Sequence, residues 1–357
     1  MNLKKIVQVS IIILVVIGIS LGIYLFFNNP TTLDNVTTAI FGDDQPTNTA
    51  PVIQEINLVA ENEIFDYWVS NNFIYYITKS GEIVRISNSS QDVLNSQTLN
   101  KLNKIEPSFD GSRIIAKFNY PNLPTFSTFS VSTGNWTPLP EGVIAATWSP
   151  NSNELVYLDE SSLNIYNPST QKTTKVLNMT QKEVDLDWVS SSEVFLSTLP
   201  SIDNNSSLWS INLNTDRLTK LINEEAGLMM NWSKTDELGL KLHNEKRTAF
   251  TSLVSMDGNT LATFSFVTMP SKCIFDSPRI YCAIPNDIPE GVALPDDYLK
   301  RATYFDDGLY LIDISADSAT ILSNPDDLLI DADHLELFGE NLLFKNRIDD
   351  RLYSLSL

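Results

Sequence analysis

The segment TWSPNSNELVYL (147–158) contains the pattern that decides the fold: an aromatic residue, a polar turn and then a strand of apolar residues. Six other segments repeat this pattern, the last three more weakly: PSFDGSRIIAKF (107–118), DWVSSSEVFLST (187–198), NWSKTDELGLKL (231–242), YWVSNNFIYYIT (67–78), IFDSPRIYCAIP (274–285) and LELFGENLLFKN (335–346). Self-similarity at a regular spacing is the signature of a repeat architecture. We therefore expect most of the chain to be built from one repeated unit.

The spacing of the anchor residues indicates what that unit is. The anchors are Trp68, Phe109, Trp148, Trp188, Trp232, Phe275 and Leu337. The intervals between the first six anchors are 39 to 44 residues, and the last interval is 62. A period near 40 with short alternating strands is typical of a β-propeller blade, and no apolar pattern of helical period runs long enough for a helical repeat. We interpret the anchors as filling the wedge between neighbouring blades rather than as a ligand-stacking ring.

Each anchor hairpin is followed by a second hairpin, most clearly in SSLNIYNPSTQKTTKVL (161–177), which gives four strands per blade. The final repeat contains only about three strands, and PVIQEINLVA (51–60) is expected to supply the fourth. Closing the ring in this way removes two open sheet edges. The sequence therefore predicts an all-β domain over residues 51–357, a seven-bladed β-propeller, with six or eight blades as alternatives.

The repeat resembles that of the TolB-like (Pro-Asp repeat) β-propeller family. Trp148-Ser149-Pro150-Asn151 matches that pattern best, and Phe109-Asp110-Gly111 and Trp232-Ser233 match in part. Trp188-Val189-Ser190 lacks the Pro and the Gly. The resemblance implies the propeller fold and, as in that family, either a periplasmic protein-binding module or the gating domain of a serine peptidase. Because propellers host many unrelated activities, it implies little more about function.

The N-terminal region predicts a membrane anchor. Residues 6–27 carry no charge, and a helix of this length spans roughly 33 Å, which matches the hydrocarbon core of a bilayer. Lys4 and Lys5 precede this stretch, so residues 1–5 are expected to be a cytoplasmic tail and residues 6–27 a transmembrane signal anchor in contact with the lipid bilayer. A cleaved signal peptide is the alternative. Residues 28–50, rich in Thr, Asn, Asp and Pro, are expected to be a flexible tether to an extracytoplasmic domain, periplasmic or at the cell surface.

Charge excludes one class of partner. The chain has 24 basic and 44 acidic residues, a net charge of −20, and residues 28–357 alone hold 22 basic and 44 acidic side chains. A domain this acidic has no electrostatic footprint for nucleic acid, so we expect none to bind.

Few residues are available for catalysis. The only histidines are His243, in the strand of a repeat, and His334. Acidic doublets recur throughout the chain, so the run Asp331-x-Asp333-His334 is interpreted as solvated loop carboxylates rather than a metal site. The nucleophile elbow G-x-S-x-G is absent, and SFDGSR (108–113) matches only the first part of a sialidase-type box. We therefore expect a protein that is not an enzyme and binds no cofactor and no metal.

The two cysteines flank a tight turn at residues 276–279. Pairing Phe275 with Ile280 and Ile274 with Tyr281 places Cys273 directly opposite Cys282. Cross-strand partners are close enough for a disulfide, and an extracytoplasmic location permits oxidation. A Cys273–Cys282 disulfide is therefore predicted, with a pair of buried free thiols as the alternative.

The interval between the last two anchors is about 20 residues longer than the others because of an insertion, NDIPEGVALPDDYLKRATYFDD (286–307). It connects the second and third strands of one blade, so it leaves on the face that also carries the loops between blades. Its candidate partner-contact residues are Tyr298, Lys300, Arg301, Tyr304 and Phe305, because aromatic residues and Arg contribute most contact energy at interfaces. A passive cap over the blade is the alternative.

The predicted function is a membrane-anchored, extracytoplasmic module that binds a protein or peptide at the cell envelope. A glycan-acting propeller enzyme, or a structural or sensory subunit without its own ligand, are the alternatives.

Overall fold

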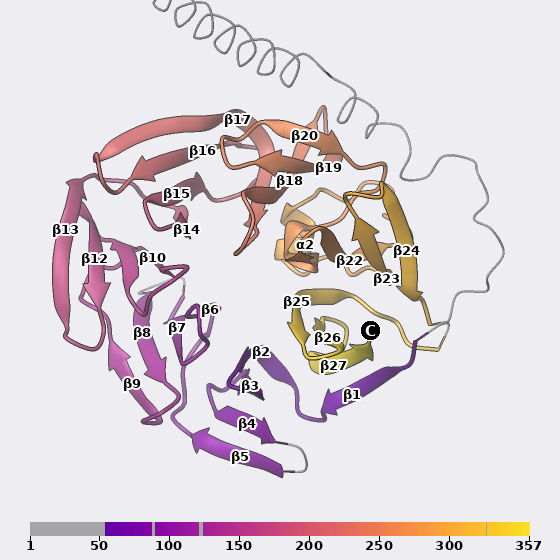
Figure 1. The fold of residues 1–357 in the computed structure, drawn as a ribbon, viewed down its shortest axis with the longest axis horizontal. Coiled ribbons are helices and arrows are strands. Elements are labelled where there is room, and N and C mark those ends of the chain that lie inside the picture. The colour runs from indigo at the N-terminus through magenta and orange to yellow at the C-terminus, as the bar shows by residue number, and fades with distance from the viewer. Residues whose placement is uncertain (1–53, 88–89, 121–123, 326) are drawn as a thin grey trace, which may run out of the picture.

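The computed structural model describes residues 54–87, 90–120, 124–325 and 327–357. These residues form antiparallel sheets placed around a common centre (Figure 1). No helix within these ranges is long and apolar enough to span a membrane. The predicted cytoplasmic tail, anchor and tether, residues 1–50, lie outside the described residues.

The first three sheets each contain four strands that pair in chain order. The first consists of β2 (Ile64–Ser70), β3 (Phe73–Thr78), β4 (Ile83–Ser87) and β5 (Ser90–Asn95). The second consists of β6 (Lys104–Pro107), β7 (Arg113–Phe118), β8 (Thr125–Ser130) and β9 (Asn135–Pro138). The third consists of β10 (Ala145–Trp148), β11 (Leu155–Leu158), β12 (Ser162–Asn167) and β13 (Lys172–Asn178). Each matches the predicted unit of two successive hairpins.

The next sheet has seven strands because one long strand belongs to two units. It consists of β14 (Val184–Ser190), β15 (Glu193–Thr198), β16 (Asn205–Asn212), β17 (Arg217–Trp232), β18 (Leu238–Glu245), β19 (Thr248–Ser255) and β20 (Thr260–Thr263). Residues 217–226 of β17 pair with β16, and residues 226–232 pair with β18. β17 is therefore the outer strand of one four-stranded unit and the inner strand of the next.

Two further four-stranded sheets complete the described ring. One follows the short 3-10 helix η2 (Pro270–Lys272) and consists of β21 (Cys273–Asp276), β22 (Arg279–Pro285), β23 (Asp307–Asp313) and β24 (Ser318–Ser323). The other consists of β25 (Ala332–Phe338), β26 (Asn341–Asn346), β27 (Arg351–Ser356) and β1 (Ile56–Ala60). β1 pairs with β27, with Ile56 opposite Leu355, so the predicted closure by the segment around residues 51–60 is confirmed. In Figure 1, β2, β6, β10 and β25, for example, lie near the centre, and β5, β9, β13 and β1 lie at the rim.

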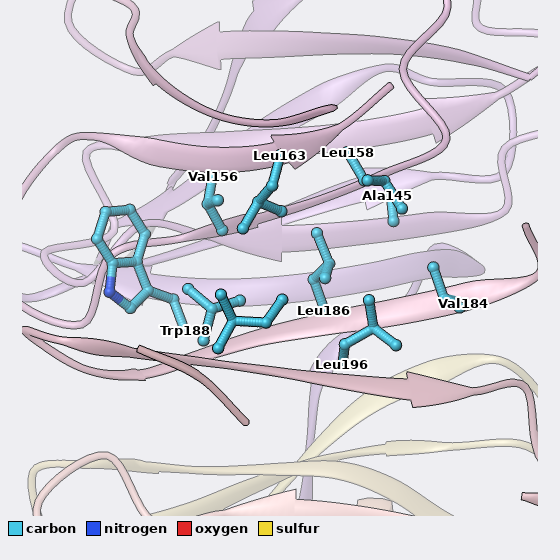
Figure 2. Packing of buried hydrophobic residues seen from close by; sticks show 10 residues of the cluster. Ala145, Val156, Leu158, Leu163, Val184, Leu186, Trp188 and Leu196 are labelled. Atoms are coloured by element: carbon cyan, nitrogen blue, oxygen red, sulfur yellow. The ribbon is translucent and has the colours of Figure 1, made fainter. Parts of the chain in front are cut away.

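The cores lie between neighbouring sheets. One such core packs Val156 and Leu163 against Leu186, Trp188 and neighbours on the next sheet, and Figure 2 shows these side chains pointing toward one another across the gap. Because strands alternate their side chains between two faces, one sheet contributes to the core on each side. Burying an apolar side chain of this size contributes about 1.5–3 kcal/mol.

The tryptophan anchors are wedge residues, as predicted. Trp68, Trp148, Trp188 and Trp232 are all buried. The indole nitrogen of Trp148 also donates to the carbonyl of Glu106 on the neighbouring sheet at 3.0 Å. These side chains therefore join one sheet to another.

Phe109 corrects the anchor prediction, since its side chain is 50% exposed. β6 ends at Pro107, and the amide of Ser108 closes the turn with the same kind of backbone hydrogen bond that Ser149 makes after β10. Pro107 therefore occupies the place that Trp148 has in the third sheet, and Phe109 lies in the turn. The predicted anchor, Phe109, was therefore wrong: the residue at the anchor position is Pro107, two residues earlier in the chain.

Truncating a side chain in the Figure 2 core tests the packing. We expect Leu186→Ala to lower the free energy of unfolding by about 2–5 kcal/mol, because Leu186 is fully buried and the cavity cannot collapse completely. The matched control Leu218→Ala removes an exposed leucine and is expected to change stability by less than about 0.5 kcal/mol. Urea unfolding measures both, and equal effects would contradict a core at this place.

Candidate functional site

The insertion predicted from the sequence is an ordered segment of the fold. Residues 286–306, here called the cap, connect β22 to β23 and contain the short helix α2 (Asp296–Leu299). The two ends of the cap meet, since the amide of Asn286 donates to the carbonyl of Asp306 at 2.8 Å. In Figure 1, α2 lies on the inner side of β22 and β23, between β18 and β25.

Polar contacts connect the cap to three other parts of the ring. The carboxylate of Asp296 accepts a hydrogen bond at 2.7 Å from the amide of Ile202, in the connection between β15 and β16. The side chain of Asn244, on β18, donates to the carbonyl of Leu294 at 2.9 Å. Arg301 forms an ion pair with Asp350, between β26 and β27. The cap therefore crosses one face of the ring rather than projecting away from it.

Apolar packing fixes the underside of the cap. Leu294, Tyr298 and Phe305 pack in one cluster with Leu242 and Met269 of the ring. The rings of Tyr298 and Phe305 stack with a centroid distance of 6.0 Å. Aromatic side chains here thus attach the cap to the sheets beneath it.

This packing corrects the contact prediction for two residues. Tyr298 and Phe305 are each only 3% exposed, so their side chains are not available to a partner. Lys300, Arg301 and Tyr304 are exposed, and their contact with a partner stays a prediction.

A buried ion network lies directly under the cap. Lys272 Nζ lies 2.5 Å from a carboxylate oxygen of Asp307 and 2.5 Å from one of Asp331, and none of these three side chains is exposed. Arg347 donates to the other carboxylate oxygen of Asp331 at 2.7 Å and to the carbonyl of Tyr298 at 2.7 Å. Two cations therefore face two carboxylates. The reading of Asp331 as a solvated loop carboxylate was wrong.

The buried surroundings of Asp307 raise the pKa of its carboxyl group. Burial raises the pKa of this carboxyl to about 6, against the opposing attraction of Lys272. The amide of Ala332 on β25 also donates to Asp307 at 2.8 Å. The network consequently joins η2, the first residue of β23 and β25 through one carboxylate.

Asp350 forms a second junction at the edge of the cap. Arg301 donates to both of its carboxylate oxygens, at 2.7 and 3.1 Å, and Lys79 approaches to 2.7 Å. Burial would raise the pKa of Asp350, but the hydrogen bonds from Arg301 and Lys79 outweigh it and hold the pKa well below the ordinary value. The basic residue Arg301 is therefore already paired within the molecule.

The inner strands carry a separate charged cluster. Lys104 on β6 reaches Asp185 on β14 at 3.0 Å, past the small residues of β10. Burial and the charge of Asp185 raise the pKa of the neighbouring Asp187 to about 7. This cluster was not predicted from the sequence, although charged residues alternate with apolar ones in KIEP (104–107) and VDLDW (184–188), which is a signal for it. Within the described ranges, no group of His, Cys, Asp and Glu side chains is arranged to hold a metal ion.

The two histidines are both on strands. His243 lies on β18 and is largely buried, in agreement with its interpretation as a strand residue. His334 lies on β25, and its Nδ1 is 2.5 Å from a carboxylate oxygen of Asp66 on β2. Burial alone would lower the pKa of His334. The negative charge of Asp66 and its hydrogen bond with the imidazole have the larger, opposite effect, so the pKa of His334 is raised. This pair bridges two neighbouring sheets.

The predicted disulfide is confirmed. Cys273 and Cys282 are bonded and lie opposite each other in the predicted register. Both are buried in the core between β18–β20 and β21–β24.

Comparison with known proteins bears on the fold alone. No family model and no curated protein matches the chain. The β-propeller domain of Cps50 (Swd1) from Myceliophteria thermophila aligns over 85% of this chain and 100% of its own, with a TM-score of 0.55 and 11% identity. The chain is a β-propeller.

Two other solved structures align with this propeller. The protein lmo1340 from Listeria monocytogenes EGD-e covers 85% of this chain and 98% of its own, with a TM-score of 0.52 and 13% identity. The tricorn protease covers 87% of this chain, with a TM-score of 0.53 and 9% identity, but this chain spans only 34% of that protein. At such identities the likeness carries no information on activity.

Replacing Asp331 tests whether the buried ion network stabilises the fold. We expect Asp331→Asn to lower the free energy of unfolding by about 3–5 kcal/mol, because Lys272 and Arg347 each lose a charged partner while buried. The control Asp203→Asn breaks an exposed pair with Arg247 and is expected to cost less than about 1 kcal/mol. Urea unfolding of both variants decides, and a cost for Asp331→Asn no larger than the control would contradict the network.

The junction at Asp350 predicts a pH dependence. A carboxyl whose pKa is lowered by folding stabilises the fold above its unfolded pKa of about 3.9, and this stabilisation is lost as pH falls through the folded pKa. Asp350→Asn is therefore expected to cost about 1.5–3 kcal/mol at pH 7, and the difference from the natural protein should shrink steadily below about pH 4. Unfolding measured from pH 7 to pH 2 checks this. A difference that is constant over the whole range would show that the charge of Asp350 is not involved.

Proposed function

We propose that this protein is a membrane-anchored, extracytoplasmic β-propeller that binds a protein or peptide at the cell envelope through the face carrying the cap. The observation that carries this proposal is the construction of the cap. A buried ion network and an apolar cluster fix its underside, while Leu299 and Tyr304 remain exposed on its outer side. A long loop fixed in this way presents side chains in a defined geometry, which lowers the entropic cost of binding.

The architecture we propose has seven blades. The shared strand β17 completes one blade with residues 217–226 and begins the next with residues 226–232, so the seven-stranded sheet counts as two blades. The serine turns that follow Trp148 and Trp232 are the feature that supports membership in a TolB-like family.

Two observations support the location. Residues 6–27 have the length and composition of a transmembrane helix, and Lys4 and Lys5 precede them. The Cys273–Cys282 disulfide is characteristic of an oxidising compartment. The expectation that the chain is not an enzyme, and the alternatives of a glycan-acting enzyme or a sensory subunit, stay predictions.

One experiment in intact cells of the native host tests location and binding together. Full-length Tyr304→Cys is treated with a membrane-impermeant benzophenone maleimide and then illuminated. We expect labelling, because the propeller lies outside the cytoplasm, and a cross-linked adduct with another polypeptide. The control Val93→Cys, on the exposed rim strand β5, is expected to be labelled without forming that adduct.

The two parts of the proposal fail separately in this experiment. If neither cysteine is labelled in intact cells but both are labelled after lysis, the extracytoplasmic location is wrong. If both are labelled and Tyr304→Cys yields no adduct beyond the control, the cap is not the binding face.

A further inference from the structure

The first and last blades of the ring meet at a junction that is called the seam here. It lies between β2 on one side and β25, β26 and the turn before β27 on the other (Figure 1). The amide of Ile64 on β2 donates to the carbonyl of Asp350 in that turn at 2.7 Å. Lys345 on β26 donates to the carbonyl of Phe65 on β2 at 2.6 Å and lies 3.3 Å from a carboxylate oxygen of Asp350. Polar contacts therefore join two blades that are far apart in the sequence.

A bulge in β25 directs His334 toward this seam. The pairing of β25 with β26 shifts its register between Asp333 and Glu336, and the backbone φ of His334 is 50°. Few residues other than glycine adopt this left-handed conformation, and His is one of the types that adopt it more often. A bulge re-aims the side chain that it carries. Here the imidazole Nδ1 lies 2.5 Å from a carboxylate oxygen of Asp66 on β2.

Tyr67, the residue after Asp66, fixes His334 in this position. Its hydroxyl donates to the carbonyl of His334 at 2.6 Å, and the two ring centroids are 4.8 Å apart. Burial and nearby carboxylates raise the pKa of Tyr67, so the phenol is uncharged at neutral pH. The side chain of His334 keeps 29% of its surface exposed. The imidazole is thus held in place by its neighbours but still reaches solvent, with which it exchanges its proton.

Carboxylates from two strands surround His334. Asp66 faces it from β2, and Asp333 and Glu336 lie near it on β25 itself. Lys345 on β26 is a cation close to Asp66. Within the part of the chain that the structure describes, these carboxylates outnumber the cation beside them, and this balance favours the charged imidazole. Burial opposes the charged form, but the carboxylates outweigh it and raise the pKa of His334.

We propose that the His334–Asp66 pair is a pH-sensitive latch between the first and last blades. While the imidazole carries its second proton, the two side chains form an ion pair across the seam. A neutral imidazole keeps at most a hydrogen bond to Asp66, so the seam opens more often. Histidine suits this role because its charge changes close to neutral pH. The inference goes beyond the proposed function, since the latch needs no partner.

The latch also bears on the cap, because Asp350 belongs to both the seam and the cap junction. Arg301 of the cap and Lys79 of the first blade each approach the carboxylate of Asp350 to 2.7 Å. Opening of the seam separates Lys79 from this carboxylate. The pH that opens the seam therefore also changes the junction that holds the edge of the cap.

The direction of the pH effect follows from the linkage between proton binding and closure. A histidine whose pKa is raised in the closed state stabilises that state below its unfolded pKa of about 6.5. This stabilisation is lost as pH rises through the raised pKa. Each unit by which the pKa of His334 exceeds about 6.5 corresponds to an about tenfold larger opening equilibrium at high pH than at low pH.

NMR of the full-length protein in non-ionic detergent measures the pKa of His334 directly. The chain contains only two histidines, so histidine labelled with carbon-13 at Cε1 gives two signals, and His243→Asn assigns them. We expect the pKa of His334 to lie above about 6.5. That of His243 should lie below this value, because burial and Lys241 lower it. A pKa of His334 at or below about 6.5 overturns the inference without any change at the seam.

Hydrogen–deuterium exchange between pH 6 and pH 9, corrected for intrinsic exchange rates, measures the opening. The reporter is the peptide containing β2, whose Ile64 amide crosses the seam, and the reference is the peptide containing β11. We expect protection of β2 to fall relative to β11 as pH rises, by about tenfold for each unit that the NMR titration gives above about 6.5.

Two matched variants show whether His334 causes this fall. His334→Asn keeps a side-chain N–H donor and tolerates the left-handed backbone, but it carries no titrating charge. We expect the fall to disappear in His334→Asn and to persist in His243→Asn. Asp187 and Asp307, whose pKa values are raised to about 7 and about 6, remain in both variants, so their titration is separated from that of His334. Protection of β2 that does not change with pH, or that falls equally in all three proteins, overturns the inference.

Discussion

Four charged side chains with almost no exposed surface, Lys272, Asp307, Asp331 and Arg347, join the cap to two blades of the ring. Taking ions out of water costs several kcal/mol each, and only mutual pairing with further hydrogen bonds offsets that cost. The pairing requires η2, the start of β23 and the residue before β25 to adopt one arrangement together. Arg347 extends this constraint to the cap, because its guanidinium donates to the carbonyl of Tyr298 at 2.7 Å.

The ring supplies the rigid frame that the network needs. Neighbouring blades pack apolar faces against each other, and β1 pairs with β27, so a strand from the start of the described chain completes the last blade and closes the ring. The disulfide between Cys273 and Cys282 lies in the blade from which the cap emerges. The cap therefore stands on elements that are restrained on both sides.

Features with a local signal could be predicted from the sequence. The repeat unit, the closing strand and the register that pairs Cys273 with Cys282 each depend on residues close together in the chain or on a regular period. The position of the insertion also followed from the period alone. Phe109 was misassigned because Pro107 replaces the aromatic residue in that repeat.

The composition of the candidate site could not be predicted in the same way. Tyr298 and Phe305 were expected at an interface because aromatic residues are frequent there, yet the same side chains suit a core. Asp331 resembles other acidic loop residues in sequence, and only its approach to Lys272, 59 positions away, distinguishes it. Contacts between residues so far apart leave no periodic pattern, and this is why the network was missed.

Hydrogen–deuterium exchange on the full-length protein shows whether the cap is a folded part of the propeller. The amides of Asp297, Leu299 and Lys300 donate to backbone carbonyls within the cap, and the cap is packed against the ring. We expect these amides to exchange as slowly as those of the blade strands, orders of magnitude more slowly than in a free peptide. Exchange of residues 286–306 at the rate of an unstructured peptide, with the strands protected, would contradict it.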